Sequence, residues 1–424
     1  MATTTPNFGW PVPTSTDLVK DGATAIEALG DGIDTSMVDL KGGTTGQILA
    51  KATNADMDFS WITNDVGDIT AVTAGTGITG GGTSGAVTVS FDQANYGGGQ
   101  FAAGKNKIIN GNFANWQRGT TFNSYANGAY SADRFFTLYN GTGSTRNATQ
   151  QTFTPGTAPV SGYEGTFFSR YDQTVAGTTA TFNTYGQRIE DVRIFAGQTV
   201  TVSFWAKAAA NTTFGVGIQQ NFGSGGSTSV TQEFTTEFAV TTSWVRYSKT
   251  ITIASISGKT IGTSSYLAVY ATMPLNATFT FDSWGWQIES GSTATPFQTA
   301  SGGSLQGELA LCQRYYYRNF PDAANVALAM GYANTTVQAR GIVKFPVTMR
   351  TRPAALEQSG TAADYAIQSQ GTVTTACSAV PAYVTTSLEE GYVSFTVASG
   401  LTAGDGLALR TGAAAAYLGW SAEL

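Results

Sequence analysis

The sequence predicts an all-β protein, and three features of composition and patterning support that class. Charged residues make up only 12% of the chain, about half the usual fraction. Gly (51 residues), Phe (24) and Tyr (18) are abundant, which suits short strands, half-buried faces and tight turns. Segments such as QTVTVSFWAKA alternate apolar and polar residues, the pattern of strands with one core face.

The length of 424 residues allows several separate cores along the chain. The predicted segments are an anchoring segment at 1–40, an intertwined β-shaft at 41–100, a jelly-roll β-sandwich at 101–300, a linker helix at 301–318 and a smaller β-domain at 319–424. We expect an elongated oligomer, because short isolated shaft strands bury a face only by pairing with identical chains.

The first segment carries an apolar stripe at Ile26, Leu29, Ile33, Met37 and Leu40, spaced three or four residues apart. This spacing favours a short helix. Glycines within it weaken a lone helix by about 1 kcal/mol each, so association of copies along the stripe supplies the missing burial. The alternative to this helix is an irregular anchoring peptide, which the sequence favours equally.

Short strands are predicted in the shaft at 69–73 and 86–91, where period-two alternation is clear, and NYGGGQ (95–100) is predicted to be a hinge. In the linker, Leu305, Leu309, Cys312 and Tyr316 are spaced 4, 3 and 4 apart. That spacing predicts a helix that packs these four side chains against the last domain.

The absence of His excludes every mechanism that requires an imidazole, from Ser-His-Asp catalysis to His-based zinc sites. The two cysteines, Cys312 and Cys377, are predicted to be buried thiols. The net charge of −6 without a basic stripe argues against a nucleic-acid partner. No apolar run spans a membrane and the first residues contain no export signal, so we expect a virion protein assembled in the host cytoplasm.

A glycine pattern at Gly75, Gly77 and Gly80 matches the dinucleotide-binding fingerprint letter for letter. The fingerprint requires a helix whose N-terminus meets the pyrophosphate, whereas a turn and a strand follow here. We therefore predict no nucleotide site and no cofactor.

Acidic pairs are the remaining catalytic possibility, since glycosidases need two carboxyl groups about 5 to 10 Å apart. The acids of the larger β-domain that were considered are Asp133, Glu164, Glu190, Asp191, Asp282 and Glu289. Nothing in their spacing pairs them, so no catalytic residue is predicted and the chain is not expected to be an enzyme.

Four aromatic residues on predicted strands are the candidate glycan-binding residues: Trp205, Trp284, Trp286 and Tyr270. Rings on an open sheet face can stack on sugar rings, and Trp205 and Trp284 are the first choices. The alternative is that these rings pack between chains or between domains.

KNKIINGNFANWQRGTTF (105–122), GQTVTVSFWAKA and WQIESGSTATPF together resemble a recurrent domain of bacteriophage tail fibres that is similar to carbohydrate-binding jelly rolls. GELALCQRYYYR and FPVTMRTRP resemble the terminal domain that often follows it, and GDITAVTAGTGITGGG resembles tail-fibre shafts. The resemblance implies a homotrimer that binds a tail, baseplate or adaptor protein through its N-terminal part and a host envelope glycan through its C-terminal domains.

Carbohydrate-binding relatives often hold calcium between an acid after their Asn-Gly-x-Phe segment and an Asp on the final strand. Asp282 matches the second position, but Ala114 and Asn115 stand at the first, so no metal site is predicted. Two other readings stay open: a tailspike-like polysaccharide depolymerase, and a purely structural tail or baseplate component.

Overall fold

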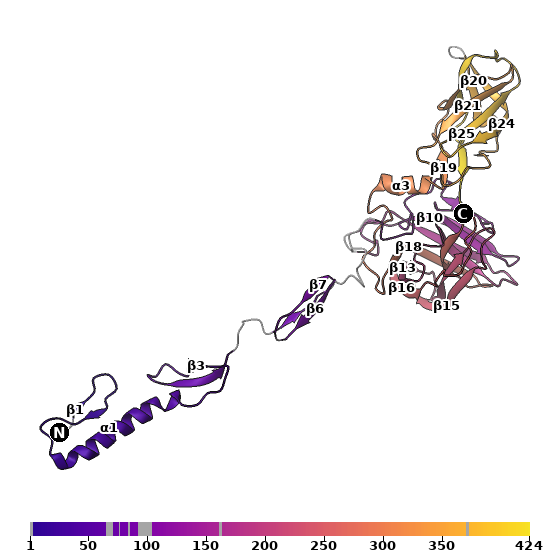
Figure 1. The fold of residues 1–424 in the computed structure, drawn as a ribbon. Coiled ribbons are helices and arrows are strands. Elements are labelled where there is room, and N and C mark those ends of the chain that lie inside the picture. The colour runs from indigo at the N-terminus through magenta and orange to yellow at the C-terminus, as the bar shows by residue number, and fades with distance from the viewer. Residues whose placement is uncertain are drawn as a thin grey trace. The chain divides into compact units, whose positions relative to one another are not determined.

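The computed structural model describes residues 3–64, 71–75, 77–83, 85–91, 104–160, 163–369 and 373–424. Two compact units, Met1–Ser90 and Phe91–Leu424, make up the chain (Figure 1). Strand residues account for 44% and helical residues for 9%, so the predicted all-β class is confirmed. The hinge predicted at 95–100 lies outside the described residues.

The first unit consists of a helix and three small sheets, β1-β2, β3-β4 and β5-β6-β7. Its elements are β1 Thr3–Thr4, β2 Pro11–Val12, the 3-10 helix η1 Val19–Asp21, α1 Gly22–Met37, the 3-10 helix η2 Val38–Leu40, β3 Gln47–Lys51, β4 Phe59–Thr63, β5 Val72–Thr73, β6 Ile78–Gly82 and β7 Val89–Phe91. The helical alternative is thus the one present, while residues 69 and 70 of a predicted strand lie outside the described range.

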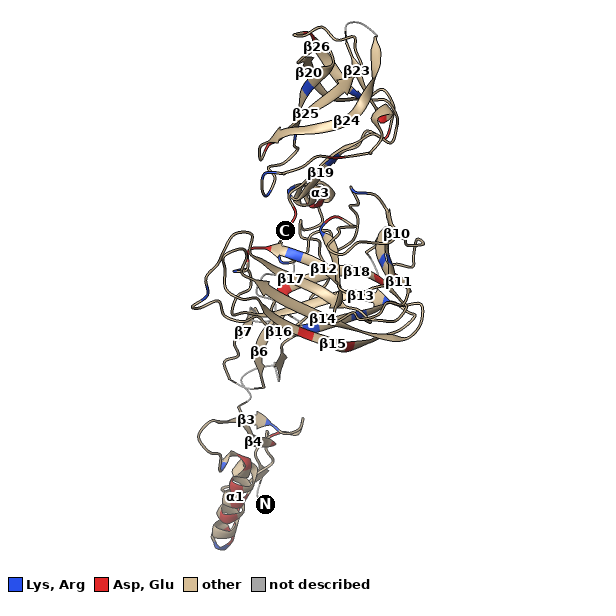
Figure 2. Ribbon diagram, turned by 90° about the vertical axis from the view of Figure 1, so that its right-hand side faces the viewer, with Lys and Arg blue, Asp and Glu red and all other residues tan. Residues whose placement is uncertain are grey.

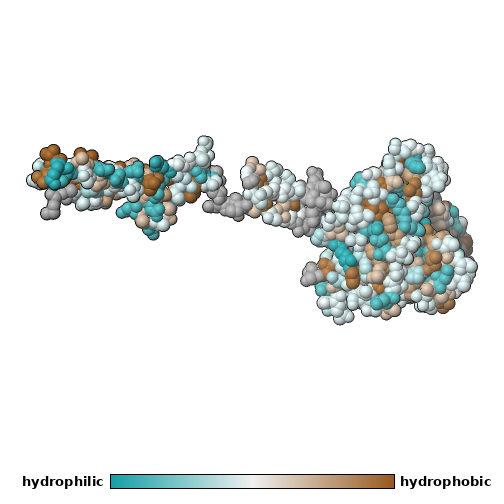
Figure 3. Space-filling view, turned by 90° about the horizontal axis from the view of Figure 1, so that it is seen from below, coloured by the Kyte–Doolittle hydropathy of each residue, from teal (hydrophilic) through white to brown (hydrophobic). Residues whose placement is uncertain are grey.

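Helix α1 has no buried residue, although all of it is described. Ile26 is 63% exposed and Met37 is 43% exposed, and the Trp10 ring, which covers Gly32, donates from Nε1 to Ser36 Oγ at 3.0 Å. Acidic bands follow the helix (Figure 2), and hydrophobic side chains lie on the surface of this unit (Figure 3). Within one chain the apolar stripe is therefore only partly covered, since Ile26 and Met37 are exposed while Leu29, Ile33 and Leu40 are half-buried.

We expect residues 3–91 to fold stably only on association, because an exposed apolar stripe leaves too little burial for a lone helix. Ile26→Glu should weaken association measured by mass photometry across a dilution series, since it places a charge in the contact. Ala28→Glu, on a different side of α1, is the matched control. A stably folded monomer of the parent chain contradicts this prediction.

The second unit begins with a β-sandwich made of a six-stranded sheet, β16-β13-β18-β11-β10-β8, and a five-stranded sheet, β15-β14-β17-β12-β9. The strands are β8 Thr121–Phe122, β9 Phe135–Tyr139, β10 Thr145–Thr152, β11 Phe167–Val175, β12 Asn183–Glu190, β13 Thr199–Lys207, β14 Thr212–Asn221, β15 Val230–Val240, β16 Val245–Thr252, β17 Tyr266–Thr272 and β18 Phe279–Ser290. The chain crosses repeatedly between the two antiparallel sheets, as in a jelly roll.

Strand β13 shows how the sequence pattern builds the core. Val200, Val202 and Phe204 point between the sheets and are at most 1% exposed, as their alternation predicts. Thr201 and Ser203, on the other face of the same strand, are also buried, at 1% and 0% exposed. Both faces of this strand are therefore covered, which alternation alone did not indicate.

Strand β18 changes its facing direction at Gly285. Phe281 belongs to the core between the sheets, and Trp286, an odd number of residues further along, belongs to it as well. The change occurs at Gly285, whose φ is 69°, beside an irregular register with β13. A Gly in the left-handed region is typical of a β-bulge, and here it turns Trp286 inward while Trp284 faces outward.

Helix α3, Leu305–Gln313, follows the sandwich and is capped by Ser304, whose side chain accepts from Gly307 N. The predicted helical face is wrong at both ends: Leu305 is 76% exposed, and Tyr316 lies in β19 because the helix ends earlier. The buried residues of α3 are Glu308 and Cys312. Both cysteines are free and buried, so the predicted buried thiols are confirmed.

A closed barrel of β20-β21-β25-β24-β23-β26 ends the chain, beside a three-stranded sheet, β19-β27-β22. The elements are β19 Tyr316–Asn319, β20 Ala327–Ala333, β21 Gln338–Lys344, β22 Glu357–Gln358, the 3-10 helix η3 Ala362–Asp364, β23 Tyr365–Gln368, β24 Thr374–Thr386, β25 Glu390–Val397, β26 Gly406–Thr411 and β27 Leu418–Ser421. Tyr365, Phe395 and Trp420 are fully buried within this domain.

Candidate functional site

A groove with a volume of about 530 Å³ lies at one end of the five-stranded sheet. It is formed where β17 ends and where β12 and β14 begin, with the middle of β15 as its other wall. The lining residues are Thr181, Phe182, Asn183, Thr184, Thr212, Thr213, Glu233, Thr235, Thr236, Thr272, Met273, Pro274 and Leu275. Seven of these thirteen residues are threonines, and four others, Phe182, Met273, Pro274 and Leu275, add apolar surface to the groove.

Thr272 is a buried lining residue of the groove, and it pairs with Thr184 on one side and Gly215 on the other. A Cβ atom at Gly215 would lie 2.0 Å from Phe234 O and 2.3 Å from Thr272 Oγ1, so glycine is required because both the neighbouring backbone and the hydroxyl approach closely. Within the described residues, Thr272 Oγ1 is buried and has no hydrogen-bond partner. Such a group favours a ligand or water that brings a hydrogen bond.

The groove's carboxylate is held in place by Tyr270. The Tyr270 hydroxyl donates to Glu233 Oε1 at 2.6 Å, and burial raises the pKa of Tyr270, with the hydrogen bond to Glu233 adding to that effect. The ring lies so close to Gly217 that a Cβ there would stand 2.3 Å from it. Tyr270 therefore lies beside the groove and orients one of its lining residues.

The four predicted sugar-stacking residues are all buried, so the expectation of an open aromatic face at these positions is wrong. Trp284 and Trp286 are 0% exposed, Tyr270 is 6% and Trp205 is 9% exposed. The structure brings together only Trp205 and Trp284, whose ring centroids are 5.5 Å apart. Trp286 lies in the central core, and Tyr270 lies on the other sheet.

Trp205 and Trp284 belong to a second aromatic cluster that covers the outer face of the six-stranded sheet. Phe153, Phe168 and Phe297 complete its buried part, and Tyr163 and Trp244 pack at its edge. Phe153 and Tyr163 come from the segment between β10 and β11, Phe297 follows β18, Phe168 lies in β11 and Trp244 directly precedes β16. A segment distant in sequence thus covers the face that strand alternation predicts to be open.

The six acids considered for catalysis each have a partner that is a hydrogen-bond donor or a cation. The pairs are Asp133 with Gln117, Glu164 with Gly156 N, Glu190 with Arg314, Asp191 with Arg193, Asp282 with Arg170 and Glu289 with Thr295. Burial raises the pKa of Asp133, which the charge of Arg118 and two hydrogen bonds from Gln117 partly offset.

The residues at the calcium position do not fit a calcium ion. Asp282 accepts two hydrogen bonds from Arg170, at 2.7 and 2.8 Å, and Lys207 Nζ lies 3.8 Å from it. The backbone oxygen of Asn115 accepts from Asn110 and from Asp133 N. Among the described residues, no three His, Cys, Asp or Glu side chains gather where a metal could bind.

We therefore expect calcium and EDTA to leave the melting temperature unchanged, because two cations already neutralise the Asp282 carboxylate. Differential scanning fluorimetry with each additive checks this, and magnesium serves as the control for ionic strength. A rise in melting temperature with calcium that EDTA reverses contradicts it.

The glycine pattern contributes no nucleotide site. Gly80 lies inside strand β6, and a Cβ there would stand 2.1 Å from Thr88 O, so this glycine permits close strand pairing. Thr76 lies outside the described residues.

Across the described ranges, none of the helices has the length and apolar character needed to span a membrane.

No protein-family model and no curated protein matches the chain. Solved structures do match part of it. The enzymatically active domain of tailspike protein 4 from bacteriophage CBA120 aligns with 40% of this chain at 16% identity and a TM-score of 0.26. The chain spans only 21% of that tailspike chain.

Two further matches are with sugar-binding proteins. A putative sugar-binding protein from Bacteroides thetaiotaomicron aligns with 44% of this chain and 99% of its own at 11% identity and a TM-score of 0.28. The xylan-binding CBM22-2 domain of Paenibacillus barcinonensis Xyn10C aligns with 40% and 98% at 16% identity and a TM-score of 0.25. Likenesses this weak decide neither a ligand nor an activity.

The groove was missed at the sequence level because threonines on strands indicate only exposed sheet positions. Thr184, Thr213, Thr235 and Thr272 come from four different strands, and their register alone brings them together. The one available signal was the Gly-rich strand around Gly215, since glycine in a strand often marks close approach of a ligand or another backbone.

Proposed function

We propose that the chain is a bacteriophage tail fibre that attaches the virion to the host surface by binding an envelope glycan in the threonine-lined groove. The groove is the observation that carries this proposal, and the sequence resemblance to tail fibres supplies its setting. In this proposal the chain forms a homotrimer, docks into a tail, baseplate or adaptor protein through its N-terminal part, and is a component of the virion.

The chemistry of the groove suits a sugar. Hydroxyl groups of Thr184, Thr213 and Thr235 both donate and accept hydrogen bonds, as sugar hydroxyls do. Phe182, 38% exposed, and Leu275, 39% exposed, offer apolar contact to the C–H face of a sugar ring. The volume of about 530 Å³ falls in the range of small-ligand sites.

The charge of the groove favours an uncharged glycan. Glu233 is the ionisable residue among its lining residues, and no Lys or Arg is among them. An acidic sugar would face this carboxylate without a cation to pair with, which disfavours its binding. Neutral surface polysaccharide or the neutral part of an envelope glycan is thus the ligand we propose.

We further propose binding without cleavage. A glycosidase of the usual kind needs two carboxyl groups, about 5 to 10 Å apart, across the scissile bond. Glu233 is the carboxylate in the groove lining, and Tyr270 holds it. Release of reducing ends from host polysaccharide by the purified protein would favour the depolymerase alternative instead.

The test is Glu233→Ala in the full chain. We expect about a 10- to 100-fold loss of affinity for host-surface glycan, measured by calorimetry and by competition of phage adsorption, because a hydrogen bond to a charged group is lost. Tyr270→Phe should give a smaller loss, since it only releases the carboxylate.

Glu237→Ala is the matched control. Glu237 lies on the same strand but pairs with Lys249 at 2.9 Å and does not line the groove. Equal binding by the parent chain and Glu233→Ala overturns the groove assignment. A folded parent chain that neither binds cells nor blocks adsorption supports a purely structural tail component.

A further inference from the structure

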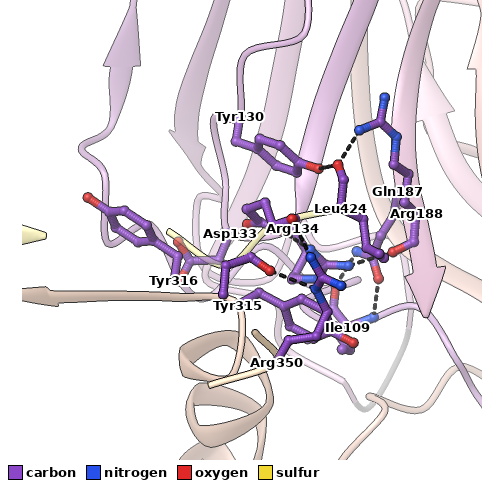
Figure 4. Close-up of polar contacts among 12 residues, drawn as sticks. Ile109, Tyr130, Asp133, Arg134, Gln187, Arg188, Tyr315, Tyr316, Arg350 and Leu424 are labelled. Carbon is purple, nitrogen blue, oxygen red and sulfur yellow. Dashed lines mark hydrogen bonds and ion pairs between the residues drawn. The ribbon is translucent and has the colours of Figure 1, made fainter. Parts of the chain in front are cut away.

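A buried cluster of charged side chains lies where β27 ends against the sandwich. Residues 422–424, here called the strap, continue from β27 of the terminal domain and lie on residues of the sandwich (Figure 4). Their partners come from the loops between β8 and β9, from β12 and from the segment after α3.

The side chain of Glu423 is the centre of this cluster. Its carboxylate forms an ion pair with Arg134 and a second one with Arg118, at 3.3 Å. The exposed fraction of the side chain is 6% for Glu423, 1% for Arg134 and 11% for Arg118. Burial lowers the pKa of Arg134, which reflects how completely its charge is removed from water.

The strap backbone is bound as closely as its side chain. Arg350 donates from Nε to Ala422 O and from Nη2 to Glu423 O, both at 2.7 Å. Ala422 N donates to Tyr315 O at 2.7 Å. Leu424 O accepts from Tyr130 at 2.9 Å and also from Arg188. Three residues thus contact the sandwich, the linker and the terminal domain.

Two tyrosines complete this cluster: Tyr315, which follows α3, and Tyr316, the first residue of β19. The Arg134 guanidinium stands 3.5 Å from the Tyr315 ring centroid, and that of Arg118 stands 3.5 Å from the Tyr316 ring centroid. Each arginine therefore contacts both a tyrosine ring and the Glu423 carboxylate. Without that carboxylate, the buried Arg134 charge has no ion-pair partner among the described residues.

We propose that the strap locks the terminal barrel domain onto the sandwich, so that the two domains keep one orientation and unfold in a single transition. The physical reason is that lifting the strap leaves buried arginine charge uncompensated, which is far more costly than breaking an exposed ion pair. This role of the strap is independent of the glycan binding proposed for the groove.

The test is Glu423→Gln in the full chain, which keeps the side-chain shape and removes the charge. Calorimetry should resolve two transitions where the parent chain shows one for residues 104–424. The sandwich transition should fall by on the order of 10 °C. Hydrogen exchange of the Ala422 amide should accelerate at least about tenfold, because its bond to Tyr315 opens.

Glu390→Gln is the matched control, because it removes an ion pair of the same barrel that is solvent-exposed, with Lys344 74% exposed. It should leave both readouts unchanged. Arg118→Gln removes only the more exposed partner of Glu423, so it can be tested even if Glu423→Gln does not fold. It should also accelerate hydrogen exchange of the Ala422 amide. A single transition and unchanged exchange at Ala422 in these variants overturn the proposal.

Discussion

Trp286→Ala is expected to destabilise the sandwich by about 3–5 kcal/mol, which approaches the whole stability of an ordinary domain. The ring is fully buried, stacks on Phe204 with centroids 4.3 Å apart, and donates from Nε1 to Ser283 Oγ at 3.1 Å. Its removal leaves a large cavity and an unpaired hydroxyl. Urea unfolding followed by near-ultraviolet circular dichroism measures the loss.

Trp244→Ala provides the comparison for this prediction. Trp244 packs only at the edge of the outer aromatic cluster and is partly buried, so its loss of stability should be smaller. If Trp286→Ala instead kept the parent's unfolding midpoint and lost glycan binding, the ring would have to act at the surface, contrary to its burial.

Alkaline pH is expected to unfold the second unit from about pH 9 upward. Burial raises the pKa of the Cys377 thiol from its ordinary 9.0 to about 12, and it also raises the pKa of Tyr171 and Tyr185. These groups are neutral in the folded chain. The unfolded chain loses their protons first as pH rises, so stability is complete below about pH 9 and falls above it.

Each of these groups contributes to the alkaline effect according to the separation between its folded and unfolded pKa values. For Cys377 alone, the loss is on the order of 4 kcal/mol by pH 12. Urea midpoints measured from pH 7 to pH 11.5 check this, and Cys377→Ala should show a shallower decline. A free energy of unfolding that stays constant to pH 11 contradicts the prediction. With no His in the chain, no imidazole changes stability near neutral pH.

Sequence alone determined the fold class, because strand patterning and turn-forming glycines act locally. The alternation of Val200, Val202 and Phe204 correctly predicts the core face of β13, since successive side chains of a strand point to opposite faces. Because the chain has no His, every mechanism that requires an imidazole is excluded, whatever the fold. The buried state of Cys312 and Cys377 followed from the usual behaviour of free thiols.

The tertiary structure decided where the aromatic side chains face. With an unbroken period of two, Trp284 and Trp286 share one face of their strand; the bulge at Gly285 places them on opposite faces. A segment before β11 then covers the outer face, where Trp205 and Trp284 were expected to be open. Neither the bulge nor the covering of the outer face can be read from neighbouring residues in the sequence. The bulge depends on how β18 pairs with β13, and the covering depends on how the segment before β11 packs on the sheet.

The candidate site and the strap were decided by tertiary structure for the same reason. Thr272, Thr213 and Glu233 meet only through the register of β17, β14 and β15, and Glu423 meets Arg134 only when β27 returns to the sandwich. Sequence specifies the period of each strand, which is a property of neighbouring residues. Contacts between residues far apart in the chain depend on register and chain return, and those are set by the packing of the whole unit.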